Sequence, residues 1–455
     1  MRRASITIPG VLCLVLVLTL PGQAGASRRT PAISVRGVQE IGRFTLHGPA
    51  GSEDDTTVEP AIAMDPNNAN HIVATYQEGR FMDGGSSAIG YATSLNGGRT
   101  WDFGELPGLT GIVGGPYDRA SDPSVAFGPD GEVYAGALVL SNGASCPSGA
   151  SVNRSDDSGI TWNAPVFADH PNCPTMDDKT WLTVDTYPSS PHFGRIYFAW
   201  DTSTGGLTDV VRWSDDKGAT WSPAVTFADS AHGGFPVSVL VQPSGNVTFQ
   251  WSDLRARTST DGGQTYGPYV TISSFQGHDP SGIRTGAGFG LGQAGVDPVT
   301  GKMYVVWQDA RFRTDGQNDI VMSSSSNGTT WTAPKRVNQD ATGSNIDHFD
   351  ESVAAFNGVV HVAYLVRKGN SSQILRQQYT VSMDGGATFS AEKTLGPNLN
   401  TQWAAQVFGG TKFMGDYFSM TAGPGVAHPV WVRPSQPSQT QTYHQTTWSA
   451  TINVS

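Results

Sequence analysis

Six copies of one eight-residue pattern constrain the fold of this chain more than any other feature of its sequence. The pattern, which we call the box, reads Ser-x-Asp-x-Gly-x-Thr followed by Trp, Tyr or Phe, with occasional replacements. The six boxes cover residues 94–101, 155–162, 214–221, 259–266, 324–331 and 382–389. Their aromatic ends are 61, 59, 45, 65 and 58 residues apart, and self-similarity at such a period indicates a repeat architecture.

Each box is expected to be a hairpin turn between two strands. Its Asp or Asn side chain accepts hydrogen bonds from backbone N–H groups that follow it, and its Gly adopts a backbone conformation that other residues resist. The Thr and the aromatic residue then re-enter a strand, which β-branched and aromatic side chains favour. The boxes therefore predict architecture, and we expect them to take no part in catalysis.

A second repeat with seven members runs in step with the boxes. Each member is a pair of short apolar strands separated by a Gly, Pro or Asn turn. The first strands begin near Glu59, Asp122, Lys179, Phe235, Gly288, Glu351 and Asp416. The second strands cover residues 72–77, 133–138, 196–200, 247–251, 303–307, 360–365 and 429–432.

A strand pair and a box hairpin together give four strands, which is one blade of a β-propeller. The sequence thus predicts an all-β fold, a single propeller of seven four-stranded blades, with six blades as the alternative if the glycine-rich fifth pair is irregular. The seventh blade lacks a box, and its outer strands are expected from residues 441–454. Residues 33–46 are expected to pair into it and close the ring, which removes exposed sheet edges.

Residues 1–26 are predicted to be a secretory signal peptide. A basic start, an apolar segment at residues 11–20 that is too short to span a bilayer comfortably, and small residues up to Ala26 are the parts of such a signal. We therefore expect a secreted protein, cleaved after Ala26, with one propeller domain over residues 27–455. No later stretch is apolar enough to predict a membrane span.

The cysteines and the net charge narrow the class of protein further. The mature chain keeps Cys146 and Cys173, which flank the second box; a disulfide is expected, with two free buried thiols as the alternative. The formal net charge is −11, and removing residues 1–26 with their two arginines and no acidic residue takes it to −13. That charge argues against nucleic acid as a partner. A site for an anionic substrate has to be built locally from Arg or Lys.

The boxes resemble the Asp-box, or BNR, repeats of the non-viral sialidase superfamily. The segments Phe-Met-Gly-Asp-Tyr-Phe at residues 413–418 and Trp-Gln-Asp-Ala-Arg at residues 307–311 are similar to segments of secreted bacterial sialidase-like proteins. The resemblance covers nearly all of the mature chain and implies a propeller that acts on glycans. Asp boxes also occur in propellers with other glycosidase activities and in non-enzymatic ones.

The resemblance also implies a set of catalytic groups. Sialidases hold the sugar carboxylate with three arginines, use a Tyr activated by a Glu as the nucleophile, and use an Asp as acid/base. The implied candidates in this chain are Tyr417 with Glu351 as nucleophile and base, Asp122 or Asp118 as acid/base, and Arg119 and Arg284 as carboxylate ligands. The arginine motif that precedes the first box in the family is absent, and Arg80 is its nearest substitute.

The alignment of the strand pairs leads to the same region independently. In a propeller the first residue of each inner strand points toward the central axis. Here these positions bring together Glu59, Asp122, Lys179, Glu351 and Asp416, with Asp178 close by. Converging carboxylates repel one another, so at least one should have a raised pKa and serve as a general acid. Glu59, Lys179 and Asp416 are then candidate substrate-binding residues; the alternative is that the ring of charges only caps strand ends or binds water.

No cofactor is expected to be required, and no metal-binding residue is assigned. A structural calcium ion is a candidate, because residues 315–319 and 347–351 place oxygen ligands close together in loops, although their spacing matches no known calcium loop. The sequence contains no zinc pattern, no phosphate-binding glycine loop and no Gly-x-Ser-x-Gly nucleophile elbow.

These observations predict a secreted, monomeric, sialidase-like glycoside hydrolase that acts on a glycan or glycoconjugate. One alternative is a non-catalytic propeller that binds a glycan or a protein, and another is a different carbohydrate-active enzyme, such as a lyase. Three arginines converging in one pocket beside Tyr417 would favour the sialidase.

Overall fold

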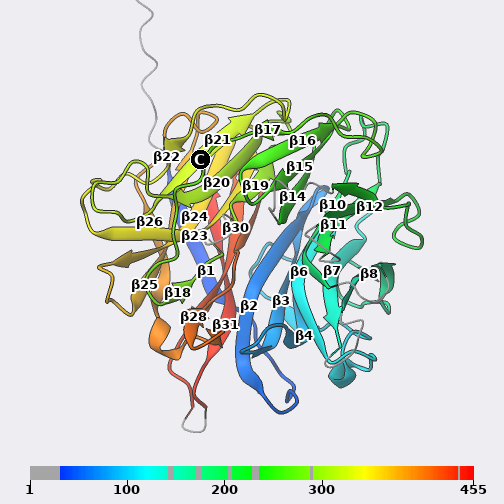
Figure 1. The fold of residues 1–455 in the computed structure, drawn as a ribbon, viewed down its shortest axis with the longest axis horizontal. Helices are drawn as coiled ribbons and strands as arrows, with labels where there is room; N and C mark the ends of the chain where they lie inside the picture. The colour runs from blue at the N-terminus through cyan, green and yellow to red at the C-terminus, as the bar shows by residue number, and fades with distance from the viewer. Residues whose placement is uncertain are drawn as a thin grey trace, which may run out of the picture. The chain divides into compact units, whose positions relative to one another are not determined.

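The strands of this protein radiate from a common centre, as Figure 1 shows. The structure is a computed structural model that describes residues 31–141, 148–169, 176–202, 208–227, 235–286, 291–438 and 441–455. Within these residues nearly all regular structure is β-strand, apart from 3₁₀ turns at Gly111–Val113 and Thr401–Trp403. No helix in the described part of the chain is long and apolar enough to cross a membrane. The predicted all-β propeller is confirmed.

Antiparallel pairing arranges the described strands in seven successive groups of four, each running from an inner to an outer strand. The first three groups are β2 (Ser52–Asp65), β3 (Asn68–Phe81), β4 (Ser86–Ser94) and β5 (Asp102–Glu105); β6 (Arg119–Phe127), β7 (Val133–Leu140), β8 (Ser148–Ser155) and β9 (Val166–Asp169); and β10 (Asp177–Val184), β11 (Ile196–Thr202), β12 (Thr208–Ser214) and β13 (Val225–Phe227).

The next three groups follow the same order along the chain. They are β14 (Pro236–Val241), β15 (Val247–Trp251), β16 (Arg255–Ser259) and β17 (Val270–Thr271); β19 (Gln293–Val296), β20 (Met303–Asp309), β21 (Asp319–Ser325) and β22 (Lys335–Arg336); and β23 (Ile346–Phe356), β24 (Val359–Lys368), β25 (Ile374–Ser382) and β26 (Lys393–Asn400). Position 288 lies outside the described residues, and the described inner strand of the fifth group begins at Gln293.

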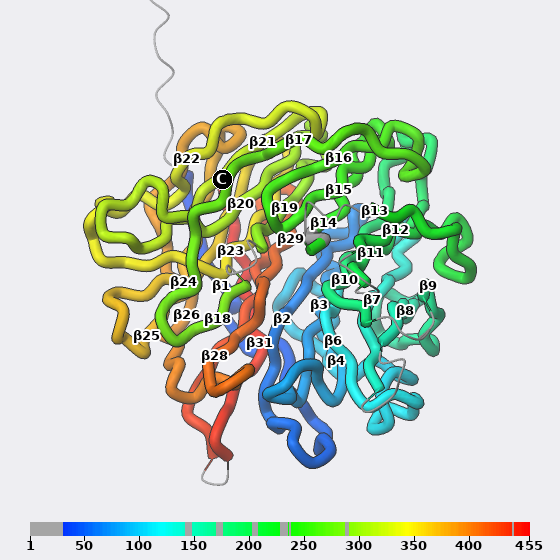
Figure 2. The backbone as a smooth tube through the Cα atoms, viewed as in Figure 1, coloured from blue at the N-terminus to red at the C-terminus, as the bar shows by residue number. Residues whose placement is uncertain are grey.

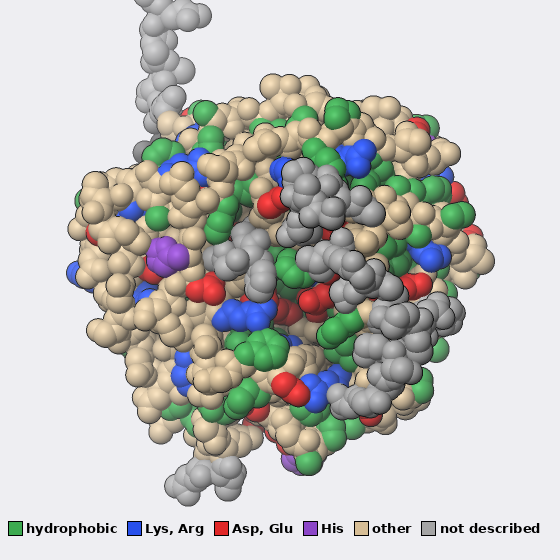
Figure 3. All heavy atoms as spheres, viewed as in Figure 1, with side chains coloured by type: hydrophobic (Ala, Val, Ile, Leu, Met, Phe, Trp, Pro, Cys, Tyr) green, Lys and Arg blue, Asp and Glu red, His purple; other side chains and the backbone are tan. Residues whose placement is uncertain are grey.

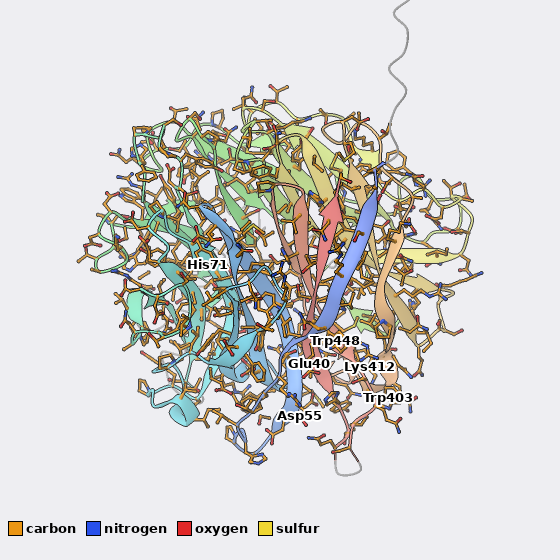
Figure 4. All side chains as sticks on the ribbon, turned by 180° about the vertical axis from the view of Figure 1, so that it is seen from behind. Glu40, Asp55, His71, Trp403, Lys412 and Trp448 are labelled. Carbon is orange, nitrogen blue, oxygen red and sulfur yellow. The ribbon has the colours of Figure 1, made fainter. Side chains whose placement is uncertain are left out.

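The seventh group joins the two ends of the described chain. It consists of β29 (Ser419–Gly423), β30 (Val426–Pro434) and β31 (Gln445–Val454), and its fourth strand is β1 (Ile33–Gly42). β1 pairs antiparallel with β31, from Ile33 opposite Val454 to Glu40 opposite Trp448, and the two strands lie side by side in Figure 4. The predicted pairing of the N-terminal segment into the last group is confirmed for residues 33–42. Single-residue contacts link this group and the first two into one continuous sheet.

A small sheet formed by connecting segments lies beside the ring of groups. β18 (Ile283–Arg284) comes from the connection before β19, whereas β27 (Gln406–Val407) and β28 (Thr411–Phe413) come from the connection before β29. β18 and β28 pair in parallel, so that Arg284 lies opposite Phe413 (Figure 2). This pairing brings segments about 130 residues apart in sequence to one place.

The core lies between neighbouring groups. Second strands contribute four of the largest fully buried side chains, Trp200, Trp251, Trp307 and Trp431, each at most 1% exposed. Both faces of these strands are covered by neighbouring groups, so the strands consist mostly of apolar residues. Replacing one such tryptophan by Ala typically costs about 3–5 kcal/mol of folding free energy.

Five inner strands shift register near the end at which they start, and four of these β-bulges share one feature. The strand register shifts between Val58 and Ala61, Ser121 and Ser124, Asp178 and Trp181, and Phe349 and Ser352. Each bulge holds a non-glycine residue with positive φ: Glu59 at 53°, Asp122 at 49°, Lys179 at 47° and Asp350 at 50°. Such conformations cost about 1–3 kcal/mol each and cluster at functional sites.

These bulges correct one residue of the sequence alignment. In the sixth group Asp350, not Glu351, has the backbone conformation of Glu59, Asp122 and Lys179. The prediction that Glu351 occupies the axial position is therefore wrong by one residue. Because side chains alternate along a strand, this offset turns the Glu351 carboxylate away from the axial cluster.

The boxes form the expected turns. In the second box, the Ser155 hydroxyl accepts a hydrogen bond from Gly159 N at 2.8 Å, and Asp157 accepts bonds from Thr161 N at 2.8 Å and Thr161 Oγ1 at 2.7 Å. The fifth box differs from its sequence alignment, because Ser325 rather than Ser324 takes the serine role and bonds Gly328 N at 2.9 Å. The serine and the glycine are therefore three positions apart in the fifth box, whereas Ser155 and Gly159 are four positions apart in the second.

Asp157→Ala is expected to lower the free energy of unfolding by about 1–2 kcal/mol, because the turn loses its side-chain acceptors. Urea unfolding measures this change. Asp102→Ala is the matched control, since Asp102 is exposed and its side chain makes no hydrogen bond among the described residues. Any turnover by the folded variant should equal that of the wild type; a loss of turnover without a loss of stability would contradict a structural role.

Candidate active site

A cavity of about 400 Å³ lies at the end of the ring where the inner strands start. Figure 3 shows charged side chains of both signs gathered around the hollow on this face. The cavity lining includes four basic residues, Arg80, Arg119, Lys179 and Arg284. It also includes six acidic residues, Glu59, Asp83, Asp122, Asp177, Asp178 and Asp416.

Arg80 reaches the cavity from the end of β3, next to Glu59. Its Nη1 donates to Gln77 Oε1 at 2.6 Å, and Gln77 Nε2 in turn donates to the Glu59 carboxylate. The guanidinium lies over the ring of Phe413, 5.0 Å from its centroid. Arg80 is thus held between a polar chain on one side and an aromatic face on the other.

Arg119 stands at the rim, at the start of β6. Its Nη1 donates to Asp83 Oδ1 and to Gly84 O, both at 2.6 Å. The guanidinium lies 4.0 Å above the centroid of Phe81. The Asp83 side chain is 73% exposed, so solvent screens this ion pair and it contributes little to stability.

Arg284 reaches the cavity on β18, through the pairing of the small sheet. It forms a bidentate ion pair with Asp416, with Nε to Oδ1 at 2.9 Å and Nη2 to Oδ2 at 2.5 Å. Asp416 N donates to Glu59 Oε1 at 3.2 Å, which links this pair to the first group of strands. A planar fork of this kind fixes the orientation of the guanidinium.

Lys179 occupies the centre of the charged group. Its side chain is 4% exposed, and its Nζ lies 3.7 Å from the centroid of the Tyr417 ring. Nζ has no hydrogen-bond partner within the described structure. Burial lowers the pKa of Lys179, and the carboxylates of Asp122, Glu59, Asp416 and Asp178 oppose that shift.

Burial also raises the pKa values of the acidic residues around Lys179. The pKa of Glu59 rises to about 8, because desolvation is reinforced by the charges of Asp122 and Asp416. Desolvation raises the pKa of Asp178 to about 7 and raises that of Asp122 against the pull of Lys179. The group therefore retains protons near neutral pH, which is the property required of a general acid.

Three cations of the cavity hold buried donors that no described group accepts: Arg80 Nε, Arg119 Nε and Lys179 Nζ. Leaving a buried charged donor without a partner is costly. Because these donors belong to residues that line one cavity, the cavity suits a polar, oxygen-rich ligand better than an apolar one.

The structure brings most of the predicted site residues together. Glu59, Asp122, Lys179, Arg119, Arg284 and Asp416 all line the one cavity. Arg80, which sequence comparison offered only as a substitute, lines it as well and completes a set of three arginines. Asp118 does not belong to this set: it is exposed and lies outside the lining.

Tyr417 and Glu351 do not form the predicted pair. The Tyr417 hydroxyl donates to Pro123 O at 3.4 Å, and the ring lines a second cavity, farther along the axis. Burial raises the pKa of Tyr417 well above its usual range, with a further contribution from the nearby carboxylates. Among the described residues no hydrogen bond or ion pair joins Tyr417 to Glu351. The bulge at Asp350 directs the Glu351 side chain away from the axial cluster.

The loops in which a structural calcium ion is a candidate contain a network of ion pairs. Arg313, whose side chain is fully buried, donates to Asp315 at 2.7 Å, Asp319 at 3.1 Å and Asp340 at 2.9 Å. Arg336 adds a second cation beside Asp319 at 2.8 Å. Asp319, Asp340 and His348 are close enough to share an ion, so a structural calcium ion stays a prediction.

Some lining residues had not been singled out from the sequence. Asp83 lies in a turn and Asp177 at a strand start, and acidic residues are common at both kinds of position. Phe408 had a local signal, since an aromatic residue followed by two glycines indicates a presented loop tip. Cys146 and Cys173 lie outside the described residues, so their disulfide stays a prediction.

No family model and no curated protein matches this chain. Among solved structures it is similar to a Hadza microbial sialidase, with 19% identity, a TM-score of 0.48, and 72% of this chain and 66% of the other covered. It is also similar to the GH93 α-L-arabinofuranosidase of Fusarium graminearum in complex with arabinobiose, with 12% identity, a TM-score of 0.46, and 92% of this chain and 98% of the other covered. A third similar structure is Trypanosoma rangeli sialidase with the inhibitor DANA, with 13% identity, a TM-score of 0.48, and 79% of this chain and 60% of the other covered. The chain spans less than two thirds of the length of either sialidase.

The melting temperature is expected to fall by roughly 2 °C between about pH 7 and about pH 8.5. Burial raises the pKa values of both Glu59 and Glu351 to about 8. In this window the folded protein keeps protons that the unfolded chain has already released, so the free energy of unfolding falls as pH rises. Buried His361 and His428, whose pKa values are lowered to about 4, have lost their protons in both states.

Scanning calorimetry at the two pH values measures this difference. Glu59→Gln removes one of the contributing groups and should make the difference smaller. An unchanged difference in the variant would show that Glu59 titrates normally.

Proposed function

We propose that the protein is a secreted, monomeric glycoside hydrolase that acts on glycans carrying an acidic sugar, built as a closed propeller of seven blades. The observation that carries the proposal is the single cavity shared by three arginines, one lysine and six carboxyl groups. Arginine is suited to a sugar carboxylate because its fork matches the carboxylate geometry.

The arginines would bind the acidic group of the sugar. Arg80 and Arg119 each keep a buried Nε donor free of any described partner. Both guanidinium groups are held against aromatic rings, so little side-chain entropy remains to be lost on binding. Arg284 would act in the same set, with Asp416 as its partner while the site is empty.

The axial carboxyl groups would supply acid–base chemistry. Glycoside hydrolysis needs one protonated carboxyl group to donate to the leaving oxygen and one carboxylate to assist water or the sugar cation. Burial raises the pKa values of Asp122, Glu59 and Asp178. Asp122 is our choice for the acid, because it lines the cavity and burial raises the pKa of its carboxyl group.

Tyr417 has no part in this proposal. Its hydroxyl bonds the Pro123 carbonyl oxygen below the cavity, and Lys179 covers its ring. The chemistry proposed here therefore rests on carboxyl groups, unlike the tyrosine chemistry that the family resemblance implies.

A second candidate function is acidic-glycan binding without catalysis. The observation that favours it is that Arg119 and Arg284 are already paired with Asp83 and Asp416. A binding site can exchange such ion pairs for ligand contacts without placing any group for chemistry.

The test combines turnover and binding on one panel. A fluorogenic sialoside, a glucuronide and neutral glycosides are offered as substrates, and the matching free sugars are titrated by calorimetry. Cleavage of an acidic glycoside with little cleavage of the neutral ones supports the hydrolase. Binding of acidic sugars without turnover supports the second candidate, and neither binding nor turnover refutes both.

A further inference from the structure

An exposed aromatic ring stands at the rim of the charged cavity. Phe408 lines the cavity and is 59% exposed, more than any other large hydrophobic side chain among the described residues. Met176, also a lining residue, is 54% exposed. A large apolar side chain left in water beside a polar cavity is a feature of binding sites.

The backbone of Phe408 is held in a costly conformation. Its φ is +27°, and Gly409 and Gly410 follow with φ of 80° and 94°. Phe408 N donates to Met82 O at 3.0 Å, which ties the loop after β27 to the turn after β3. A non-glycine residue with positive φ persists only where the surrounding structure enforces it. The surrounding turn therefore holds the Phe408 ring in place at the rim of the cavity.

The ring is close to the charged floor of the cavity. The Arg284 guanidinium lies 5.6 Å from the centroid of Phe408 and 5.5 Å from that of Phe413. A ligand whose acidic group reaches Arg284 would therefore extend past Phe408 on its way to solvent. The part of the ligand at the rim meets an aromatic face, whereas the part at the floor meets cations and carboxyl groups.

We propose that Phe408 is a platform for the second sugar ring of the substrate, the ring next to the acidic sugar held at the floor. A pyranose has one face of C–H groups, which an aromatic face attracts and shields from water. This inference rests on the proposed function and specifies its substrate class: an acidic sugar joined to at least one further sugar, rather than a lone acidic glycoside.

The test uses two ligands that differ by one ring, a free acidic monosaccharide and a disaccharide in which the same sugar is linked to a neutral hexose. Calorimetry gives both Kd values for the wild type, Phe408→Ala and Phe408→Trp. Phe408→Ala should weaken disaccharide binding by about 10-fold and change monosaccharide binding by less than about 2-fold. Phe408→Trp should restore disaccharide binding.

Phe193→Ala is the matched control, because Phe193 is 48% exposed and does not line the cavity. It should change neither Kd. Equal Kd values for the disaccharide in wild type and Phe408→Ala would overturn the platform while leaving the proposed function intact. An equal loss for both ligands would also overturn it, since the ring would then act on the cavity as a whole. Failure of the wild type to bind either ligand would overturn the proposed function itself, and the platform with it.

Discussion

Asp122→Asn is expected to lower kcat on an acidic glycoside by about 10²–10⁴-fold, because the amide can neither give nor take the proton that the carboxyl group transfers. The variant should fold, since Asn is nearly the same size and is among the residues that tolerate the φ of 49° found at this position. Steady-state kinetics measure kcat, and the melting temperature reports whether the fold is retained.

Two matched variants sharpen this expectation. Asp118→Asn changes the same kind of group on the approach to β6, but Asp118 is exposed and outside the cavity lining, so kcat should stay within about 2-fold. Tyr417→Phe removes only a hydroxyl that bonds the Pro123 carbonyl. Full activity in Asp122→Asn, together with loss of activity in Tyr417→Phe, would replace the carboxyl chemistry by that of a tyrosine nucleophile.

Arg313→Ala is expected to lower the free energy of unfolding by about 3–5 kcal/mol, because it leaves buried carboxylates without their cation. The Arg313 side chain is fully buried between Asp315, Asp319 and Asp340. Arg313 Nη2 also donates to Ser344 Oγ at 3.1 Å. Guanidinium unfolding measures the change, which should appear as a lower midpoint.

Arg43→Ala is the surface comparison for this prediction. Arg43 is 59% exposed and pairs with Glu40 at 3.1 Å, and exposed pairs of this kind contribute at most about 1 kcal/mol. If the two variants lose similar amounts of stability, the Arg313 network is not the structural ion-pair cluster described above. Added calcium that rescued Arg313→Ala would show that the carboxylates accept a metal once the arginine is gone.

Local sequence signals predict the repeating part of the fold. The boxes at residues 94–101 and 155–162, and the apolar second strands such as Val133–Leu140, depend on turn residues and on alternation along the chain. Both signals act over fewer than about ten residues. The partner of the N-terminal strand could be assigned by a different argument. In a closed ring only the last blade lacks a fourth strand, and β1 supplies it.

Part of the candidate site also follows from the sequence. Glu59, Asp122 and Lys179 occupy equivalent positions in successive repeats, and a closed ring brings equivalent positions to one axis. The repeat pattern was therefore enough to predict that these charged side chains meet near the axis. The raised pKa values of the acidic members follow from that convergence and from burial.

Contacts between distant segments determine the rest. A single-residue bulge puts Asp350 rather than Glu351 at the axial position, and no local pattern indicates on which residue a bulge falls. Arg284 reaches Asp416 only because β18 pairs with β28, a contact between connections that no repeat contains. The direction of the Tyr417 hydroxyl is likewise set by the Pro123 carbonyl of another blade. Side-chain direction at such positions depends on register and on packing partners far away in the chain, whereas strand and turn propensities are properties of neighbouring residues.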